Sequence, residues 1–184
     1  MHVFHKVLDK VEDQGGIEPK TQENMKLLAI FALLCVLGVN AHGEDLQESD
    51  VKKQFTQCRH SNYRTWYSVG GLCVKYIPEY LTFQEAEYKC EGMCKGGHLV
   101  SLHTSSSNSA MGNFVRHYTR AKVWLGGEVK HGHWIWTDGG CFNYKNFIGH
   151  PATLRHSCLS MTGGYTWNPV SCNQKISFIC GFPE

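Results

Sequence analysis

A segment late in the chain, GGCFNYKNFIGHPATLRHS at residues 139–157, combines basic and aromatic side chains and contains no carboxylate. Guanidinium and ammonium groups bind sulfate, phosphate and carboxylate, and aromatic rings add flat faces for planar groups. The segment therefore predicts a binding surface for anionic groups, such as those of sulfated or sialylated glycans. The candidate ligand-binding residues in it are Lys145, His150, Arg155 and His156.

The three aromatic residues of this segment, Phe142, Tyr144 and Phe147, have a competing use. Large rings are usually buried, so each could instead pack the loop onto the core. We expect packing for each ring taken singly. The cationic side chains have no such structural use, and the prediction of an anion-binding surface depends on them.

Carboxylates are scarce in the same part of the chain, because Asp138 is the only one from Val129 to Pro183. Catalytic triads and acid–base pairs need a positioned carboxylate, and calcium needs 6 to 8 oxygen ligands. A metal could still bind His131 and His133, but the sequence shows no third ligand for them. We therefore expect no enzymatic activity and no cofactor, with calcium binding disfavoured.

Net charge points to the same class of partner. Residues 58–182 contain twelve Lys and Arg and six Asp and Glu, an excess of six positive charges. Such an excess favours glycosaminoglycans, anionic cell surfaces or acidic proteins, although it could also serve solubility alone. We expect no nucleic acid partner, and the sequence does not predict the oligomeric state.

The cysteine content indicates a secreted, disulfide-bonded domain. Of nine cysteines, Cys35 lies in the apolar segment KLLAIFALLCVLGVNA at residues 26–41, which is typical of a secretory signal rather than of a membrane span of about 20 residues. The other eight imply a disulfide framework with 105 arrangements of pairs. Zinc is the competing use for Cys90 and Cys94, but no second Cys or His pair has zinc-finger spacing.

The same features suggest how the chain is divided. We expect the true start at Met25, a signal peptide at 25–41, a polar arm at 42–57 and one domain at 58–182, with export from the cell. Residues 1–24 are then an upstream segment without structure, or alternatively the cytoplasmic tail of a signal anchor.

Two helices are predicted early in the domain. Thr82 and Glu85 match a capping box that starts a helix ending near Met93, with Phe83, Ala86 and Cys90 facing inward. A weaker helix follows at 105–120, where Gly112 interrupts an apolar face formed by Met111, Phe114, Val115 and Tyr118.

Most of the remaining apolar runs read as strands. Gly70 and Gly71 indicate a hairpin that one disulfide could close. Short aromatic or β-branched runs are separated by turn residues; they are HLVSL, VWLGG, HWIWTDGG, CLSM, YTWNPVSC and ISFICGF. Two helices followed mostly by strands predict an α+β fold.

Residues 58–182 resemble the C-type lectin-like domain through three motifs: Trp-Leu-Gly-Gly at 124–127, Trp-Thr-Asp-Gly at 136–139, and Trp-Asn at 167–168 before Cys172. Residues 90–103 are similar to the matching segment of eosinophil major basic protein, a calcium-free member, and the layout also resembles secreted fish lectins. The resemblance implies short, mostly antiparallel strands and the disulfides Cys58–Cys73, Cys90–Cys180 and Cys158–Cys172. Cys94 and Cys141 are then paired by elimination, unless one of them reaches a second chain.

Sugar-binding members of this family hold calcium with a Glu-Pro-Asn or Gln-Pro-Asp tripeptide and a Trp-Asn-Asp motif. Here these positions are His150-Pro151-Ala152 and Trp167-Asn168-Pro169, so only Asn168 is kept, and it becomes the fifth candidate ligand-binding residue. The resemblance implies a calcium-independent lectin that recognises glycans or other anionic ligands, with innate immunity as its expected context. The alternatives are a calcium-dependent carbohydrate-binding lectin and a lectin-like antifreeze or antimicrobial protein.

Overall fold

The computed structural model describes residues 54–149, 155–163 and 165–184. Its elements are η1 (Ser61–Tyr63), β1 (Tyr67–Val69), β2 (Leu72–Leu81), α3 (Phe83–Met93), β3 (His98–Leu99), α4 (Ser105–Tyr118), β4 (Val123–Lys130), β5 (His133–Trp136), β6 (Ser157–Met161), β7 (Trp167–Ser171) and β8 (Ile176–Pro183). The predicted signal peptide and upstream segment, most of the polar arm and His150 lie outside the described residues. Within the described ranges, no helix has the length and apolar character needed to cross a membrane.

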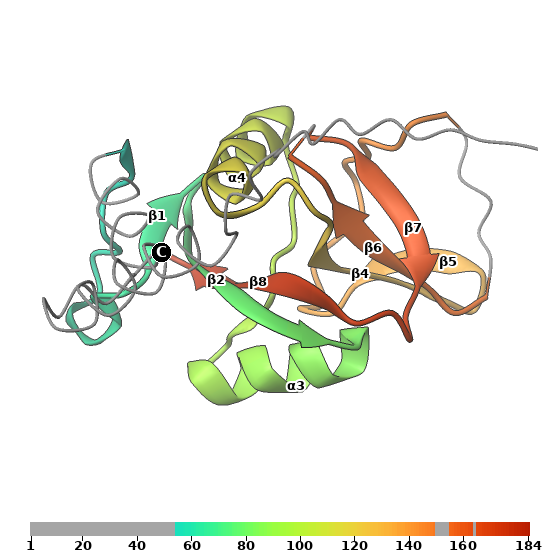
Figure 1. The fold of residues 1–184 in the computed structure, drawn as a ribbon, viewed down its shortest axis with the longest axis horizontal. Coiled ribbons are helices and arrows are strands. Elements are labelled where there is room, and N and C mark those ends of the chain that lie inside the picture. Colours follow the sequence, from blue (N-terminus) through green and yellow to red (C-terminus); the bar gives the residue numbers. More distant parts are fainter. Residues whose placement is uncertain (1–53, 150–154, 164) are drawn as a thin grey trace, which may run out of the picture. The chain divides into compact units, whose positions relative to one another are not determined.

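The strands form one sheet in the order β1-β2-β8-β4-β6-β7, with β3 paired to β8 and β5 paired to β4. The β4–β8 pair is parallel and the other pairs are antiparallel. The last strand, β8, therefore lies between the early strand β2 and the late strand β4, as Figure 1 shows. The predicted α+β fold is confirmed.

Both helices begin with a capping box. Thr82 Oγ1 accepts a hydrogen bond from Glu85 N, and Glu85 Oε2 accepts one from Thr82 N at 2.9 Å. Hydrogen bonds from Thr82 to the ionised carboxylate hold the pKa of Glu85 below its ordinary value. The predicted inward residues Phe83, Ala86 and Cys90 are buried, and so is Glu87, which the apolar pattern did not indicate.

Helix α4 continues through Gly112, which is buried inside it. A Cβ added at Gly112 would lie 2.0 Å from Tyr165 Cδ1. The glycine therefore does not interrupt the helix but makes room for the Tyr165 ring, which comes from the distant β6–β7 connection.

Apolar side chains form a core on each side of the central strands, with α3 and α4 on opposite sides of the β2–β8 pair (Figure 1). The α3 side contains Phe83, Trp124 and Phe178, and the α4 side contains Phe114 and Trp167. Phe55 packs edge to face on Phe114 at 5.2 Å, so the end of the predicted polar arm already packs on the domain.

Three of the predicted disulfides are present: Cys58–Cys73, Cys90–Cys180 and Cys158–Cys172. The fourth prediction, Cys94–Cys141, is wrong, because both cysteines are free. Cys94 is buried at the end of α3, where its sulfur would lie 2.3 Å from a Cβ added at Gly97, whereas Cys141 is exposed after β5. Pairing by elimination fails because it assumes that every cysteine forms a disulfide.

The two free thiols should differ in reactivity, since the thiolate is the reactive form and burial raises the pKa of Cys94. In the folded protein without reductant, we expect maleimide or iodoacetamide to label Cys141 and to leave Cys94 unmodified. After unfolding without reductant, mass spectrometry of the chain without residues 1–41, which include Cys35, should find two labels. Finding no label after unfolding would show that Cys94 and Cys141 form a disulfide, contrary to this prediction.

Candidate functional site

The loop after β5 is held by aromatic packing around Trp167, which is 1% exposed. The ring centroid of Trp167 lies 5.4 Å from those of Trp136 and Tyr144, 5.6 Å from Phe147 and 5.9 Å from Phe142. The prediction that each loop aromatic packs onto the core is confirmed. These rings are therefore engaged in packing, and the exposed loop cations remain as candidates for ligand contact.

Amide hydrogen bonds fix the same loop to the start of β7. Trp167 N donates to Asn146 O at 2.9 Å, and Trp167 Nε1 donates to the buried Asn108 Oδ1 at 2.7 Å. The carbonyl oxygen of Tyr165 accepts from Asn108 Nδ2 at 3.0 Å and from Asn146 Nδ2 at 2.6 Å. Helix α4, the loop and the β6–β7 connection are thereby joined through Tyr165 and Trp167.

Asn168 and Pro169 lie in β7, the edge strand of the sheet. Proline is tolerated there because an edge strand leaves some backbone N–H positions unpaired. Asn168 is half-buried, its carbonyl accepts from Ser160 Oγ at 3.0 Å, and its Nδ2 donates to Thr166 O at 3.4 Å. The pair therefore offers one neutral side-chain oxygen where calcium would need carboxylates.

Asp138 holds a turn. Its Oδ1 accepts from Gly140 N at 2.8 Å and its Oδ2 accepts from Ser101 Oγ, while His103 Nε2 lies 3.1 Å from the same hydroxyl oxygen. A serine-hydrolase triad places the carboxylate on the imidazole, whereas here it contacts the serine directly. This arrangement matches a turn-stabilising network and not a nucleophilic triad.

The predicted cations lie at two ends of β7. Lys145 is exposed next to Asn146, which bonds the first residue of β7, Trp167. Arg155 and His156 are exposed at the other end, where the His156 carbonyl accepts from Cys172 N at 3.2 Å. Trp167 and Cys172 are five residues apart, or about 16 Å at about 3.3 Å per residue. Among the described cations, Lys145 therefore lies at one end of β7, and Arg155 and His156 lie at the other.

A basic groove that the sequence did not single out lies at the Lys145 end. Its volume is about 450 Å³, and Arg116, Arg120, Thr162 and Gly163 line it. Arg116 Nε and Nη2 donate to Gly163 O at 3.1 and 3.0 Å, and the guanidinium carbon lies 4.7 Å from the centre of the Tyr165 ring. We call this the Arg116 groove.

The guanidinium of Arg116 is fixed before any ligand arrives. The Tyr165 ring that faces it is itself held by a hydrogen bond from its hydroxyl to Asn113 Oδ1 at 2.7 Å. A guanidinium has five N–H donors, and Gly163 uses two of those of Arg116, so three remain for a ligand. Such a group can bind one sulfate, phosphate or carboxylate through two parallel hydrogen bonds.

A sequence signal for this groove existed. Residues 92–127 contain no Asp or Glu, and Arg116 and Arg120 are four residues apart at the end of a helical pattern. Basic residues at helix C-termini are common because they complement the helix dipole, so the pattern alone does not separate binding from helix stabilisation. The groove becomes visible only when the β6–β7 connection lies against α4.

Comparison with known proteins identifies the family. The Lectin C-type domain family matches residues 79–182, more than half of the chain, and the chain belongs to that family. It is 35% identical over 124 residues to the C-type lectin lectoxin-Lio1 of Erythrolamprus poecilogyrus, covering 62% of this chain and 76% of that one. It is 30% identical over 125 residues to the C-type lectin APL of Agkistrodon piscivorus piscivorus, covering 62% and 93%.

Solved structures give the same result. Human lithostathine superposes with a TM-score of 0.61 and 26% identity, covering 72% of this chain and 94% of that one. A calcium-independent type II antifreeze protein superposes with a TM-score of 0.57 and 27% identity, covering 64% and 91%. The predicted resemblance to the C-type lectin-like domain is confirmed.

Proposed function

We propose that this chain is a secreted C-type lectin-like protein that binds anionic glycans without calcium and without catalysing a reaction. The observation that carries the proposal is the Arg116 guanidinium, held against Gly163 and Tyr165 in a groove beside Arg120. A preorganised cation loses little side-chain entropy on binding, which favours a specific contact over a diffuse charge effect.

The charge around this groove supports an anionic ligand. Residues 92–127, which include all of α4, contain no carboxylate, and Asp138 is the only one from Val129 to Pro183. Both oxygens of Asp138 accept hydrogen bonds, Oδ1 from Gly140 N in its own turn and Oδ2 from Ser101 Oγ. An anion at Arg116 and Arg120 therefore meets little repulsion from this part of the chain.

The spacing of the cations favours an extended ligand. Lys145 lies at the Arg116 end of β7, and Arg155 and His156 lie at the other end, about 16 Å away by the strand rise. A polysaccharide with repeated sulfate or carboxylate groups can contact both ends, whereas a single sugar cannot. Sulfated glycosaminoglycans are the ligand class that best fits this spacing.

The oxygen ligands available around β7 support calcium-independent binding. Asn168 supplies one neutral oxygen, and Pro169 stands where sugar-binding relatives have a carboxylate. Calcium needs 6 to 8 oxygen ligands, and carboxylates to neutralise its charge. The likeness to an antifreeze protein described as calcium-independent supports the same proposal, since that protein uses this fold without the ion.

Binding to immobilised heparin tests the proposal, with a neutral polysaccharide as the reference. We expect retention on heparin that is unchanged by a calcium chelator and that falls steeply as salt rises, because screening weakens contacts between exposed charges. The variant Arg116→Ala/Arg120→Ala should bind at least tenfold more weakly. The Lys145→Ala/Arg155→Ala variant should also lose affinity while remaining folded.

A charge-matched control separates the groove from general basicity. Arg64→Ala/Lys175→Ala removes two exposed positive charges elsewhere in the domain and should bind heparin within about twofold of the parent. Equal losses in the groove variant and the control would reject a specific site. Retention that a chelator abolishes would support a calcium-dependent lectin instead.

An ice-binding role is a second candidate, favoured by the likeness to the type II antifreeze protein. Ice binding should appear as thermal hysteresis in dilute solution, and it should not depend on Arg116 or on salt in the manner expected for heparin. Hysteresis together with no retention on heparin would favour this candidate over the first.

A further inference from the structure

A second group of chemically capable side chains lies on α3, away from the basic groove. Glu87 and Glu91 are one helical turn apart and so share a face of α3, and His98 begins β3 just after the turn that ends the helix. One ligand atom from each of these residues lies within 4.8 Å of the others. We propose that Glu87, Glu91 and His98 form a binding site for a zinc ion.

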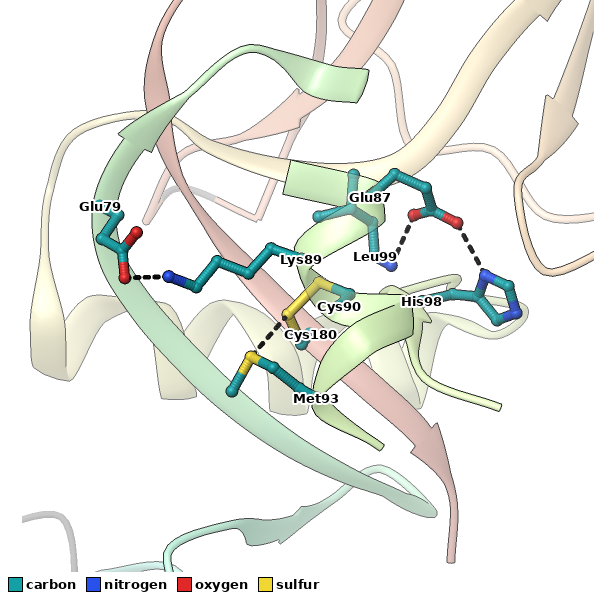
Figure 2. Close-up of a disulfide and its surroundings, with 8 residues drawn as sticks. All are labelled: Glu79, Glu87, Lys89, Cys90, Met93, His98, Leu99 and Cys180. Atoms are coloured by element: carbon teal, nitrogen blue, oxygen red, sulfur yellow. Dashed lines mark hydrogen bonds and ion pairs between the residues drawn. A yellow bond between two sulfur atoms is a disulfide. The ribbon is translucent and has the colours of Figure 1, made fainter. Parts of the chain in front are cut away.

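Glu87 is positioned by the fold before any ion binds. It is 5% exposed, its Oε2 accepts from Leu99 N at 2.9 Å, and its Oε1 lies 2.7 Å from His98 Nδ1. Figure 2 shows Glu87 and His98 pointing toward one another between α3 and β3. Little rearrangement is needed to bring the two donor atoms to one ion, which lowers the entropic cost of binding.

The elements that carry the three residues are themselves rigid. The buried Cys90–Cys180 disulfide, one residue before Glu91, ties α3 to β8, and β3 is paired with β8 through His98 and Leu99. Figure 2 shows this disulfide beside the glutamate–histidine pair. The spacing between α3 and β3 is therefore set independently of the charged side chains.

Charge also favours a cation here. Glu87 and Glu91 carry two negative charges when ionised, and the imidazole of His98 does not offset them when it is neutral. The neighbouring Lys89 contacts Glu79 on β2 instead, on the other side of α3 in Figure 2. The positive charge nearest in sequence on this helix is thus engaged elsewhere.

A shallow groove gives an ion and its water access to the two glutamates. Its volume is about 160 Å³, and Glu87, Glu91, Glu128, Lys130 and Thr137 are among its lining residues. A three-ligand zinc site keeps an open position for water or another group.

The donor types select zinc over calcium. Zinc binds imidazole nitrogen and carboxylate oxygen at about 2.0–2.2 Å in tetrahedral geometry, which places two donors about 3.4 Å apart. The Glu87–His98 contact of 2.7 Å must therefore open by about 0.7 Å. Zinc would take the Nδ1 lone pair, and the neutral ring would carry its proton on Nε2. Calcium prefers a shell made of oxygen alone.

Zinc titration of the oxidised, folded protein tests the proposal by calorimetry and by thermal unfolding. We expect one zinc ion per chain with a dissociation constant in the micromolar range or below, and a Tm that rises with zinc because the ion binds only the folded state. His98→Gln and Glu91→Gln should each weaken zinc binding at least tenfold and abolish the Tm rise. Calcium at the same concentration should not raise the Tm.

Three control variants exclude other zinc ligands. His131→Gln/His133→Gln removes the exposed imidazoles of the β4–β5 turn, and Cys94→Ser and Cys141→Ser each remove a free thiol. All three should bind zinc as the parent does. No zinc uptake by the parent at 100-fold molar excess over about 1 µM protein would overturn the proposal, as would unchanged uptake in His98→Gln or loss confined to a control.

Discussion

Replacing Trp167 with alanine should lower the free energy of unfolding by about 3–5 kcal/mol, the range for removing a large buried aromatic side chain. The ring packs against four other aromatic rings, three of which, Phe142, Tyr144 and Phe147, belong to the loop after β5. Its Nε1 also donates to the buried Asn108 Oδ1, which would lose its partner. Urea unfolding followed by far-ultraviolet circular dichroism measures the loss.

Two further variants separate the packing of Trp167 from its hydrogen bond. Trp167→Phe keeps much of the ring and loses the donor, so it should cost about 1–3 kcal/mol for the unpaired acceptor, plus a smaller packing loss. Tyr80→Ala removes an aromatic side chain that is 64% exposed and should change stability by no more than about 0.5 kcal/mol. A loss below about 1 kcal/mol for Trp167→Ala would show that the loop does not depend on this residue.

Removing the Cys90–Cys180 disulfide should cost about 4.6 kcal/mol according to the chain-entropy relation, because it closes a loop with a sequence separation of 90. The double variant Cys90→Ala/Cys180→Ala leaves the unfolded chain far less constrained. It also removes two sulfur atoms from fully buried positions between α3 and β8. Chemical denaturation of the purified variant, compared with the parent, measures the difference.

The Cys158–Cys172 disulfide provides the matched comparison, since its sequence separation is only 14. The same relation gives a cost of about 3.0 kcal/mol for Cys158→Ala/Cys172→Ala. The long-loop variant should therefore be the less stable of the two by roughly 1.6 kcal/mol. If the short-loop variant is the less stable, local packing and not chain entropy governs these disulfides.

The sequence predicted structure correctly where a short local pattern is compatible with only one local structure. The capping box at Thr82 and Glu85 predicted the start of α3, because side-chain and backbone groups three residues apart satisfy each other. The paired glycines 70 and 71 predicted the β1–β2 hairpin, and both have positive φ angles. The motif residues Trp124, Trp136 and Trp167 are all buried, as expected for core positions that define the family.

Tertiary structure decided whatever depends on residues distant in sequence. Arg116 and Gly163 are 47 residues apart, and the groove they share exists only where α4 meets the β6–β7 connection. In the sequence, Glu87 looks like an ordinary polar residue of α3. Its role depends on β3, which places His98 and the amide of Leu99 beside its carboxylate. In the sequence, Gly112 looks like a helix breaker. In the structure, its missing side chain leaves room for the Tyr165 ring.

The amino-acid sequence by itself determined the fold class, the family, three disulfides and the lack of clustered carboxylates around Asn168. These properties depend on local pattern, composition and motif order. Only the folded chain decided that Cys94 and Cys141 stay apart and that Lys145 and Arg155 lie at opposite ends of β7. The physical reason is that burial and side-chain distance are set by packing between elements distant in sequence, which local sequence patterns do not reveal.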